Sequence, residues 1–261
     1  MNPTDRPSTR VAEAEERFEI QFPQGTPDEF DQDEEWCEVR LKGERRRIRF
    51  HDYAELYEVP GLYEQLFYDE LKCDSPRVVC SLLAECLEDA HVDPDGLRVL
   101  DVGAGNGIVG EELKEIGVGP IVGVDIIEEA AEAAERDRPD VYEDYKVLDF
   151  TDLSEDDHRD LSERSFNCLV TVAALGFGDV PPDAFTAAYN LVEDGGYVAF
   201  NIKEDFIAHA DETGFSGLIR RALKDAALEV KSQRRYRHRM SIAGEPLYYV
   251  AVVAEKRRDL P

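Results

Sequence analysis

The feature that most constrains this chain is a glycine-rich turn between an apolar run and a helical pattern, within RVLDVGAGNGIVGEELKEI at residues 98–116. A short apolar run without polar alternation is typical of a strand that is buried on both faces. Gly103, Gly105 and Gly107 leave out side chains where the backbone must turn tightly and approach a ligand. Apolar residues then recur at helical spacing, namely Val109, Leu113 and Ile116. The segment therefore predicts a strand, a ligand-binding turn and a helix that packs on a sheet.

Two classes of cofactor are bound by turns of this kind. Residues 105–110 satisfy the G-x-G-x-x-G pattern of dinucleotide-binding folds, and Asp125 lies 20 residues beyond Gly105, where those folds keep a ribose-binding acid. Asp101 indicates a class of cofactor other than dinucleotides, because it lies at the end of the strand just ahead of the first glycine. The resulting Val-Leu-Asp-Val-Gly-x-Gly-x-Gly pattern resembles motif I of the class I S-adenosylmethionine (SAM) methyltransferases. That resemblance implies a turn that holds the amino-acid and ribose parts of SAM.

The segments that follow resemble the same family in the same order. Residues 121–125 resemble its second strand, residues 145–150 its third strand with the following loop, and residues 166–172 its fourth strand. Residues 191–200 resemble the Gly-Gly turn that leads into its fifth strand. Ordered signals along the chain are much more specific than a single glycine turn.

The resemblance also assigns roles to single residues. Asp125 would accept both ribose hydroxyls, Asp149 would bind the adenine amino group, and Phe150 would cover the adenine ring. Asp152 is close enough in sequence to replace Asp149 in that role. The implied cofactor site comprises Asp101, Gly103, Ala104, Gly105, Asn106, Gly107, Asp125, Ile126, Asp149, Phe150 and Ala173, with Tyr57 and Tyr63 as a lid over SAM.

A closer resemblance is carried by residues 166–203, in particular by their Ala-Leu-Gly-Phe-Gly-Asp-Val-Pro link. This link, together with Val141 and Tyr142 ahead of the third strand, resembles the methyltransferase-like family encoded in the Williams–Beuren syndrome region and its bacterial relatives. No acceptor follows from that resemblance.

The ordered segments predict an α/β fold, with a Rossmann-like, doubly wound, seven-stranded sheet. The sheet is expected to be mostly parallel, with the last strand antiparallel and an N-terminal helical and hairpin lid. Residues 230–240 and 248–254 read as two strands, and the resemblance implies that they form the antiparallel pair that closes the sheet.

The chain divides into three parts. Residues 1–34 are expected to be a flexible acidic arm, residues 35–74 an N-terminal hairpin with an aromatic lid segment, and residues 75–261 the SAM-dependent methyltransferase domain. Ser75 and Pro76 are typical of the N-cap and the first position of a helix, so the domain is expected to begin with a helix capped by Ser75.

The composition excludes several functions. The formal net charge is −28, whereas nonspecific binding to nucleic acid or to an anionic membrane needs a positive face. The N-terminus lacks the apolar core of a signal peptide, and no window approaches about 18 uncharged apolar residues, so a cytoplasmic protein is expected. The 5 cysteines form no CxxC and the 5 histidines show no metal-ligand spacing, so no metal is expected.

The sequence gives little information about the residues that would bind the methyl acceptor. Residues 172–176, after the fourth strand, read Val-Ala-Ala-Leu-Gly and contain no polar catalytic group. The catalytic residue is therefore unknown, and His51, Tyr53, Glu204 and His209 are weak candidates. Two alternatives stay open: a non-catalytic scaffold that binds SAM or a partner protein, and an NAD-dependent oxidoreductase, for which no second domain remains. We expect methyl transfer from SAM to an unidentified small-molecule acceptor.

Overall fold

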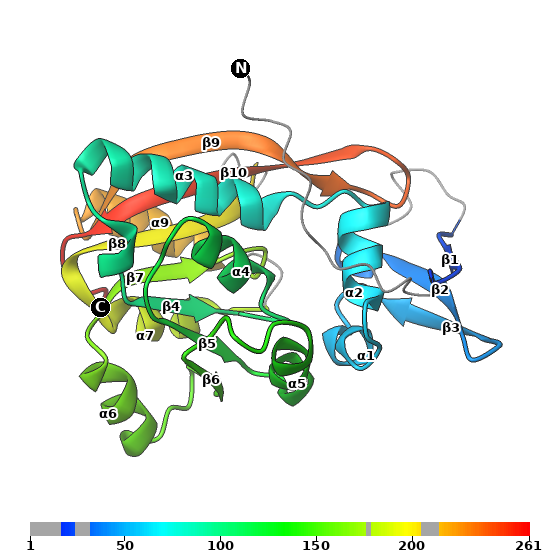
Figure 1. The fold of residues 1–261 in the computed structure, drawn as a ribbon. Helices are drawn as coiled ribbons and strands as arrows, with labels where there is room; N and C mark the ends of the chain where they lie inside the picture. Colours follow the sequence, from blue (N-terminus) through cyan, green and yellow to red (C-terminus); the bar gives the residue numbers. More distant parts are fainter. Residues whose placement is uncertain (1–16, 24–31, 176–178, 205–213) are drawn as a thin grey trace.

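The structure is a computed structural model that describes residues 17–23, 32–175, 179–204 and 214–261. Within these ranges the main sheet consists of β4 (Val99–Val102), β5 (Ile121–Asp125), β6 (Asp144–Val147), β7 (Phe166–Thr171), β8 (Val192–Lys203), β9 (Leu228–Met240) and β10 (Pro246–Lys256). Their order in space is β6-β5-β4-β7-β8-β10-β9 (Figure 1). The five strands β4, β5, β6, β7 and β8 run parallel to one another, and β10 is antiparallel to both β8 and β9. The predicted seven-stranded Rossmann-like sheet with an antiparallel last strand is confirmed.

Helices cover both faces of this sheet (Figure 1). They are α3 (Ser75–Ala90), α4 (Ile108–Glu115), α5 (Glu128–Asp137), α6 (Glu155–Glu163), α7 (Pro182–Asn190) and α9 (Gly214–Lys224). Val99 of β4 packs with apolar side chains of α3 and α4, whereas Leu100 and Val102 pack with those of α6, α7 and α9. Both faces of β4 are buried, which accounts for an apolar run in which Asp101 is the only polar residue.

A separate N-terminal unit lies beside the main sheet (Figure 1). It contains β1 (Ile20–Gln21), the short 3₁₀ turn η2 (Gln32–Glu34), β2 (Trp36–Leu41), β3 (Glu44–Arg49), α1 (Tyr53–Tyr57), α2 (Leu62–Glu64) and the π-helical turn η3 (Gln65–Glu70). A second 3₁₀ turn, η4 (Pro94–Gly96), precedes β4. The hairpin β2–β3 and the aromatic helices have a small core of their own, which includes Phe50 and Leu66.

Part of the expected N-terminal arm is strand. Ile20 pairs with Val39, and Gln21 with Glu38, in an antiparallel ladder between β1 and β2. Phe18, Ile20 and Phe22 alternate with polar residues, and all three pack against the core of the hairpin. This period of two is the strand signal that the acid-rich composition of the region obscures.

The start of α3 differs from the expected cap. Asp74 occupies the N-cap position and makes no side-chain cap hydrogen bond, while Ser75 is already helical. The Ser75 hydroxyl lies 2.6 Å from the Tyr236 hydroxyl and 2.6 Å from Nδ1 of His238 instead. A residue type typical of helix caps therefore serves a tertiary contact here.

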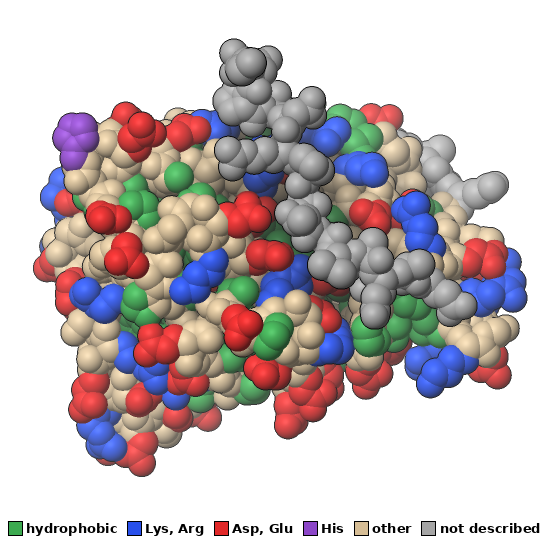
Figure 2. All heavy atoms as spheres, in the orientation of Figure 1, with side chains coloured by type: hydrophobic (Ala, Val, Ile, Leu, Met, Phe, Trp, Pro, Cys, Tyr) green, Lys and Arg blue, Asp and Glu red, His purple; other side chains and the backbone are tan. Residues whose placement is uncertain are grey.

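The face of the molecule shown in Figure 2 mixes acidic and basic side chains rather than separating them. Arg234 on β9 pairs with Glu85 at 2.6 Å, and Arg235 pairs with Glu204 at 2.7 Å. The basic run of β9 is thus offset by acids from other elements. Across the described residues, helices fall short of the length and apolar character that crossing a membrane requires.

Replacing Gly123 by alanine should lower the free energy of unfolding by about 1–3 kcal/mol, the usual cost of overpacking a core. A Cβ at Gly123 would lie 2.9 Å from ring carbons of both Tyr142 and Tyr145. Hydrogen bonds made by both phenols hold these rings in place. Gly96→Ala is the matched control, because a Cβ at Gly96 would meet no atom within 4 Å. Urea unfolding measures both variants, and equal stabilities would contradict the expected clash.

Candidate active site

Two adjoining cavities lie at the carboxyl ends of β4, β5 and β7, where ligands bind in open α/β sheets. The larger has a volume of about 580 Å³ and the smaller about 70 Å³. Both are lined by His51, Tyr53, Tyr57, Tyr63, Gly103, Val172 and Ala173. The site is therefore bounded by the sheet on one side and by the lid helices α1 and α2 on the other.

Glycine shapes the turn that follows β4. Gly103 and Gly105 have φ values of +71° and +54°, in a region that side chains rarely adopt. A Cβ on Gly105 would lie 2.5 Å from the hydroxyl oxygen of Tyr57. The Tyr145 hydroxyl donates a hydrogen bond to the Gly105 carbonyl at 2.7 Å. Glycine at this position therefore allows the Tyr57 side chain of α1 to lie directly against the turn.

Asp125 ends β5 beside this turn. Its Oδ2 accepts a hydrogen bond from the Gly105 N–H at 2.9 Å, and its Oδ1 accepts from the N–H groups of Ile126 and Ile127 at 2.8 and 3.2 Å. Burial raises the pKa of Asp125, although these three N–H groups act in the opposite direction. A carboxylate has about four acceptor positions. These three hydrogen bonds leave about one acceptor position, on Oδ2, for a ligand hydroxyl in the larger cavity, which Asp125 lines.

Another part of the larger cavity combines apolar walls with an acid. Ile126, which is 61% exposed, and the buried Phe150 both line it. Asp149 lines it as well, whereas Asp152 is absent from the described residues of its wall. Asp149 accepts hydrogen bonds from the Thr151 hydroxyl at 2.7 Å and the Thr151 N–H at 2.8 Å, and these bonds lower the pKa of Asp149. The acid at this wall is therefore Asp149, in its ionised form.

Asp101 and Gly107 lie outside the described walls of both cavities. The Asp101 side chain is fully buried, and one of its oxygens accepts a hydrogen bond from the Tyr142 hydroxyl at 2.8 Å. The other oxygen, Oδ1, has no hydrogen-bond partner among the described residues. Burial raises the pKa of Asp101 to about 7. The described hydrogen bond of Asp101 thus holds the Tyr142 phenol within the core.

Asp101 should make stability depend on pH between about 4 and 7. A carboxyl whose pKa rises on folding, here from 3.8 to about 7, contributes stability that is fully present below the lower value and is lost as pH rises through the higher one. Asp101→Asn removes this titration, so its free energy of unfolding relative to wild type should increase by about 2–3 kcal/mol between pH 5 and 8. Urea denaturation of both proteins without ligand measures the difference. A difference that stays constant with pH would show an ordinary pKa.

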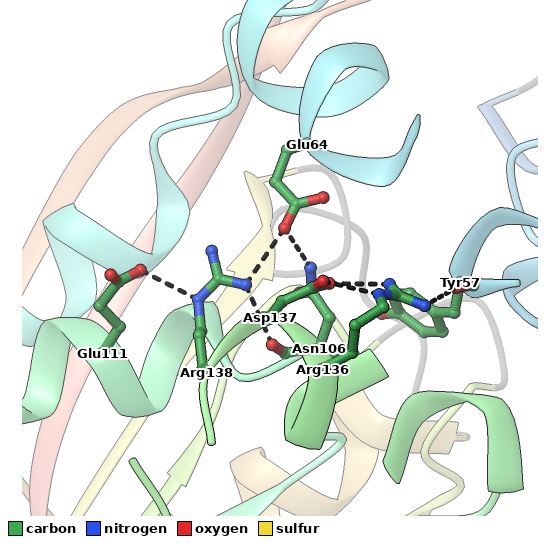
Figure 3. A network of polar contacts seen from close by, with 7 residues as sticks. All are labelled: Tyr57, Glu64, Asn106, Glu111, Arg136, Asp137 and Arg138. Carbon is green, nitrogen blue, oxygen red and sulfur yellow. Dashed lines mark hydrogen bonds and ion pairs between the residues drawn. The ribbon is translucent and has the colours of Figure 1, made fainter. Parts of the chain in front are cut away.

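A network of buried polar contacts fastens the lid to the turn (Figure 3). Glu64 of α2 accepts hydrogen bonds from Nδ2 of Asn106 at 2.6 Å and from Nη1 of Arg138 at 3.1 Å. The Arg138 side chain is only 8% exposed, and its Nη1 also donates to the Asn106 carbonyl at 3.1 Å. Arg136 donates to the Tyr57 carbonyl at 3.0 Å. These contacts hold α1 and α2 over the glycine turn.

His51 and Asp179 form an acid–imidazole pair in this site. Nδ1 of His51 lies 3.4 Å from Oδ1 of Asp179, and both residues line the larger cavity. Tyr53 packs edge-on against the imidazole, with 5.7 Å between ring centroids. Burial raises the pKa of Tyr53 and of Tyr57 well above the usual range, so both phenols stay neutral. Of the candidate bases, His51 is the one that the structure brings to the site beside a carboxylate.

The other candidate bases lie elsewhere. Glu204 pairs with Arg235 on the exposed side of β9 and is absent from the described walls of both cavities. His209 lies outside the described residues. Within the described part of the chain, no group of three or more His, Cys, Asp or Glu side chains could hold a metal ion.

Sequence reasoning missed several residues of the site. His238 of β9 and Tyr249 of β10 line the smaller cavity, and Asp179 lines the larger one. One signal was present, because Tyr236 and His238 alternate with arginines in β9 and so share the face opposite the charged one. The pairing of Asp179 with an imidazole 128 residues away has no local signal.

Known proteins resemble this chain in sequence and in fold. A family model described as a methyltransferase domain matches residues 72–240. The ubiquinone biosynthesis O-methyltransferases of Thiobacillus denitrificans and Neisseria meningitidis serogroup C are 30% identical over 113 and 118 residues, and each match covers 43% of this chain. The chain spans about half the length of these curated relatives, 47% in both cases. A crystal structure of an S-adenosylmethionine-dependent methyltransferase from Clostridium acetobutylicum has the same fold, with a TM-score of 0.51 and 13% identity over 75% of this chain and 96% of that one.

Proposed function

Because the chain belongs to the methyltransferase domain family, we propose that it transfers the methyl group of SAM to an oxygen atom of a small-molecule acceptor. The observation that carries the proposal is the pair of adjoining cavities, which brings the glycine turn and Asp125 together with the His51–Asp179 pair. When bound, SAM supplies a methyl group that is already activated on a sulfonium. The chain's own residues then need to bind the cofactor and the acceptor, orient them towards each other, and exclude water. An oxygen acceptor is supported by the names of the two O-methyltransferase relatives.

The residues of the site fit SAM. Oδ2 of Asp125 retains about one acceptor position for a ribose hydroxyl, and Ile126 with Phe150 provides apolar walls for the adenine ring. Gly103 and Gly105 allow a ligand to approach the backbone closely. The larger cavity, at about 580 Å³, is within the range of roughly 300–1,000 Å³ that small-molecule sites usually have.

His51 would act as the general base of the reaction. Asp179 would orient the imidazole, and the ring would take the proton of an acceptor hydroxyl. A positioned base of this kind contributes about 10²- to 10⁴-fold to a rate. The neutral phenols of Tyr53 and Tyr57 would exclude water from the same volume.

Calorimetric titration with SAM, S-adenosylhomocysteine and NAD tests this function. We expect the two adenosyl ligands to bind with dissociation constants of roughly micromolar order, equivalent to about −8 kcal/mol, and NAD not to bind. Binding of NAD alone would contradict the proposal. Binding of SAM without methyl transfer to any hydroxyl compound in an acceptor screen would favour a non-catalytic scaffold.

We further propose that the chain lies in the Williams–Beuren-like branch of the family, which its Ala-Leu-Gly-Phe-Gly-Asp-Val-Pro link supports. We also propose a cytoplasmic enzyme without nucleic-acid or membrane partners. The net charge of −28 supports this proposal, because it disfavours approach to other polyanions.

A further inference from the structure

A polar cluster behind the smaller cavity joins α3, β8 and β9. The Ser75 hydroxyl oxygen lies 2.6 Å from the Tyr236 hydroxyl and 2.6 Å from Nδ1 of His238. Nδ2 of Asn201 donates hydrogen bonds to the hydroxyl oxygens of Ser75 at 3.2 Å and of Tyr236 at 2.8 Å. Oδ1 of Asn201 accepts a hydrogen bond from the N–H of Ala173, which lines both cavities, at 2.7 Å.

The positions of the protons follow from these partners. The N–H of Ala173 identifies the acceptor end of the Asn201 amide, so Nδ2 is its donor end. The Tyr236 hydroxyl oxygen accepts a hydrogen bond from Asn201. Within the cluster, Ser75 is the acceptor that remains for the O–H of Tyr236. Ser75 then accepts two hydrogen bonds, and its single proton goes to Nδ1 of His238 at 2.6 Å rather than to the sulfur of Cys73, a weak acceptor that lies 3.9 Å from the same nitrogen. A neutral His238 ring therefore carries its proton on Nε2.

The His238 ring lines the smaller cavity and is only 5% exposed. Burial and the neighbouring charge of Arg239 hold the pKa of His238 well below its usual range, so the ring is neutral at pH 7. The ring of Tyr249 lies against it, with 4.1 Å between centroids and a tilt of 34°. In the described part of the chain, the polar contacts of the ring are made by Nδ1. The Nε2–H group is therefore the one left for a ligand.

We propose that His238 binds the acceptor in the smaller cavity by donating a hydrogen bond from Nε2–H to an acceptor oxygen that carries no proton. Ser75, Tyr236 and Asn201 are positioning residues that hold this tautomer. The inference rests on the proposed function, which requires an acceptor beside the cofactor. As a hydrogen-bond donor, His238 does not remove a proton, and that role stays with His51.

The walls of the smaller cavity indicate the chemical class of the acceptor. Aromatic rings line it, including those of Tyr53, Tyr63, Tyr68 and Tyr249, and such rings favour a planar ligand. Its volume of about 70 Å³, against about 580 Å³ for the larger cavity, is enough for only part of a ligand. The oxygen-bearing end of a planar acceptor, with an ionised hydroxyl or a carbonyl oxygen, would therefore enter this cavity.

The tautomer can be measured directly. We would record ¹⁵N shifts of the full chain labelled at its 5 histidines, with S-adenosylhomocysteine present, and assign His238 by comparison with His238→Gln. At pH 7 the wild type should show a neutral His238 ring protonated on Nε2. Ser75→Ala should give a mixture of the two tautomers. A ring protonated on Nδ1, or on both nitrogens, would overturn the inference.

The donor role can be tested with 4-nitrophenol, a planar probe that ionises near neutral pH and absorbs visible light as the anion. Its anion should bind the S-adenosylhomocysteine complex of wild type about tenfold more tightly than that of His238→Phe, which is the worth of about one hydrogen bond. His238→Gln returns an N–H donor to the cavity, so the anion should bind this variant within about threefold of wild type. The affinity for S-adenosylhomocysteine itself should stay within about twofold in both variants.

Three outcomes would overturn the inference while the proposed function stands. In the first outcome, the probe anion binds wild type and His238→Phe equally. In the second, it fails to bind the wild-type complex at all. In the third outcome, S-adenosylhomocysteine itself binds His238→Phe about tenfold more weakly than wild type, which would assign His238 to the cofactor. Failure of S-adenosylhomocysteine to bind the wild type would instead contradict the proposed function, and this inference with it.

Discussion

The Asp125→Ala variant should bind SAM at least about tenfold more weakly than the wild type. Asp125 lines the larger cavity, and its carboxylate keeps about one acceptor position beyond those used by the three backbone N–H groups. A hydrogen bond to a charged group contributes about 1.5–3 kcal/mol, and each 1.4 kcal/mol is about tenfold in affinity. Calorimetric titration of both proteins with SAM measures the loss.

Two control variants distinguish a contact of Asp125 with the ribose from its hydrogen bond to the Gly105 N–H of the turn. Asp125→Asn keeps one side-chain oxygen for the Gly105 N–H, so its affinity should lie between those of wild type and Asp125→Ala. Asp152→Ala changes an exposed side chain outside the described cavity wall and should bind SAM as the wild type does. Unchanged affinity in Asp125→Ala would mean that the ribose lies elsewhere.

Arg138→Met should lower the free energy of unfolding by about 3 kcal/mol and weaken SAM binding. The guanidinium lies between Glu64 of the lid and the Asn106 carbonyl of the turn, at 3.1 Å from each. Its removal leaves the Glu64 carboxylate, which is 16% exposed, without its hydrogen-bonded cation and weakens the attachment of the lid to the turn. Thermal or urea unfolding and titration with SAM measure the two effects.

A double-mutant cycle distinguishes the network from general damage to the fold. Glu64→Gln combined with Arg138→Met removes both charges, so the double variant should be more stable than Arg138→Met alone. Glu111→Gln removes the other carboxylate that contacts Arg138, but Glu111 is 51% exposed, so its effect should stay below about 1 kcal/mol. Strictly additive losses for Glu64 and Arg138 would contradict the assignment of the lid contact.

The parts of the fold that could be predicted from the sequence are those with local signals. The buried strands β4 and β5 are mostly apolar in sequence, and the glycine turn between β4 and α4 has a fixed pattern. Ser75 was misinterpreted because the same residue type suits a helix cap and a tertiary hydrogen bond. The strand β1 was missed because only two of its residues pair, within a region dominated by acids.

The site divides in the same way. The larger cavity is lined by residues from the ends of consecutive strands, so Asp125 and Asp149 could be located by their positions after apolar runs. The smaller cavity is assembled from distant segments, since His238 lies 163 residues from Ser75 in the chain. Contacts of this kind depend on how β9, β10 and the lid pack together, and no spacing in the sequence records that packing.

The central claim is that the larger cavity holds the adenosine of SAM, with its ribose on Asp125 and its sulfur towards the wall shared with the smaller cavity. The most direct test is a crystal structure of the protein with S-adenosylhomocysteine. We predict that both ribose hydroxyls contact the Asp125 carboxylate, that the adenine lies against Ile126 and Phe150, and that the sulfur faces the side lined by His51. Adenosine outside the larger cavity, or ribose hydroxyls bonded to residues other than Asp125, would contradict the claim.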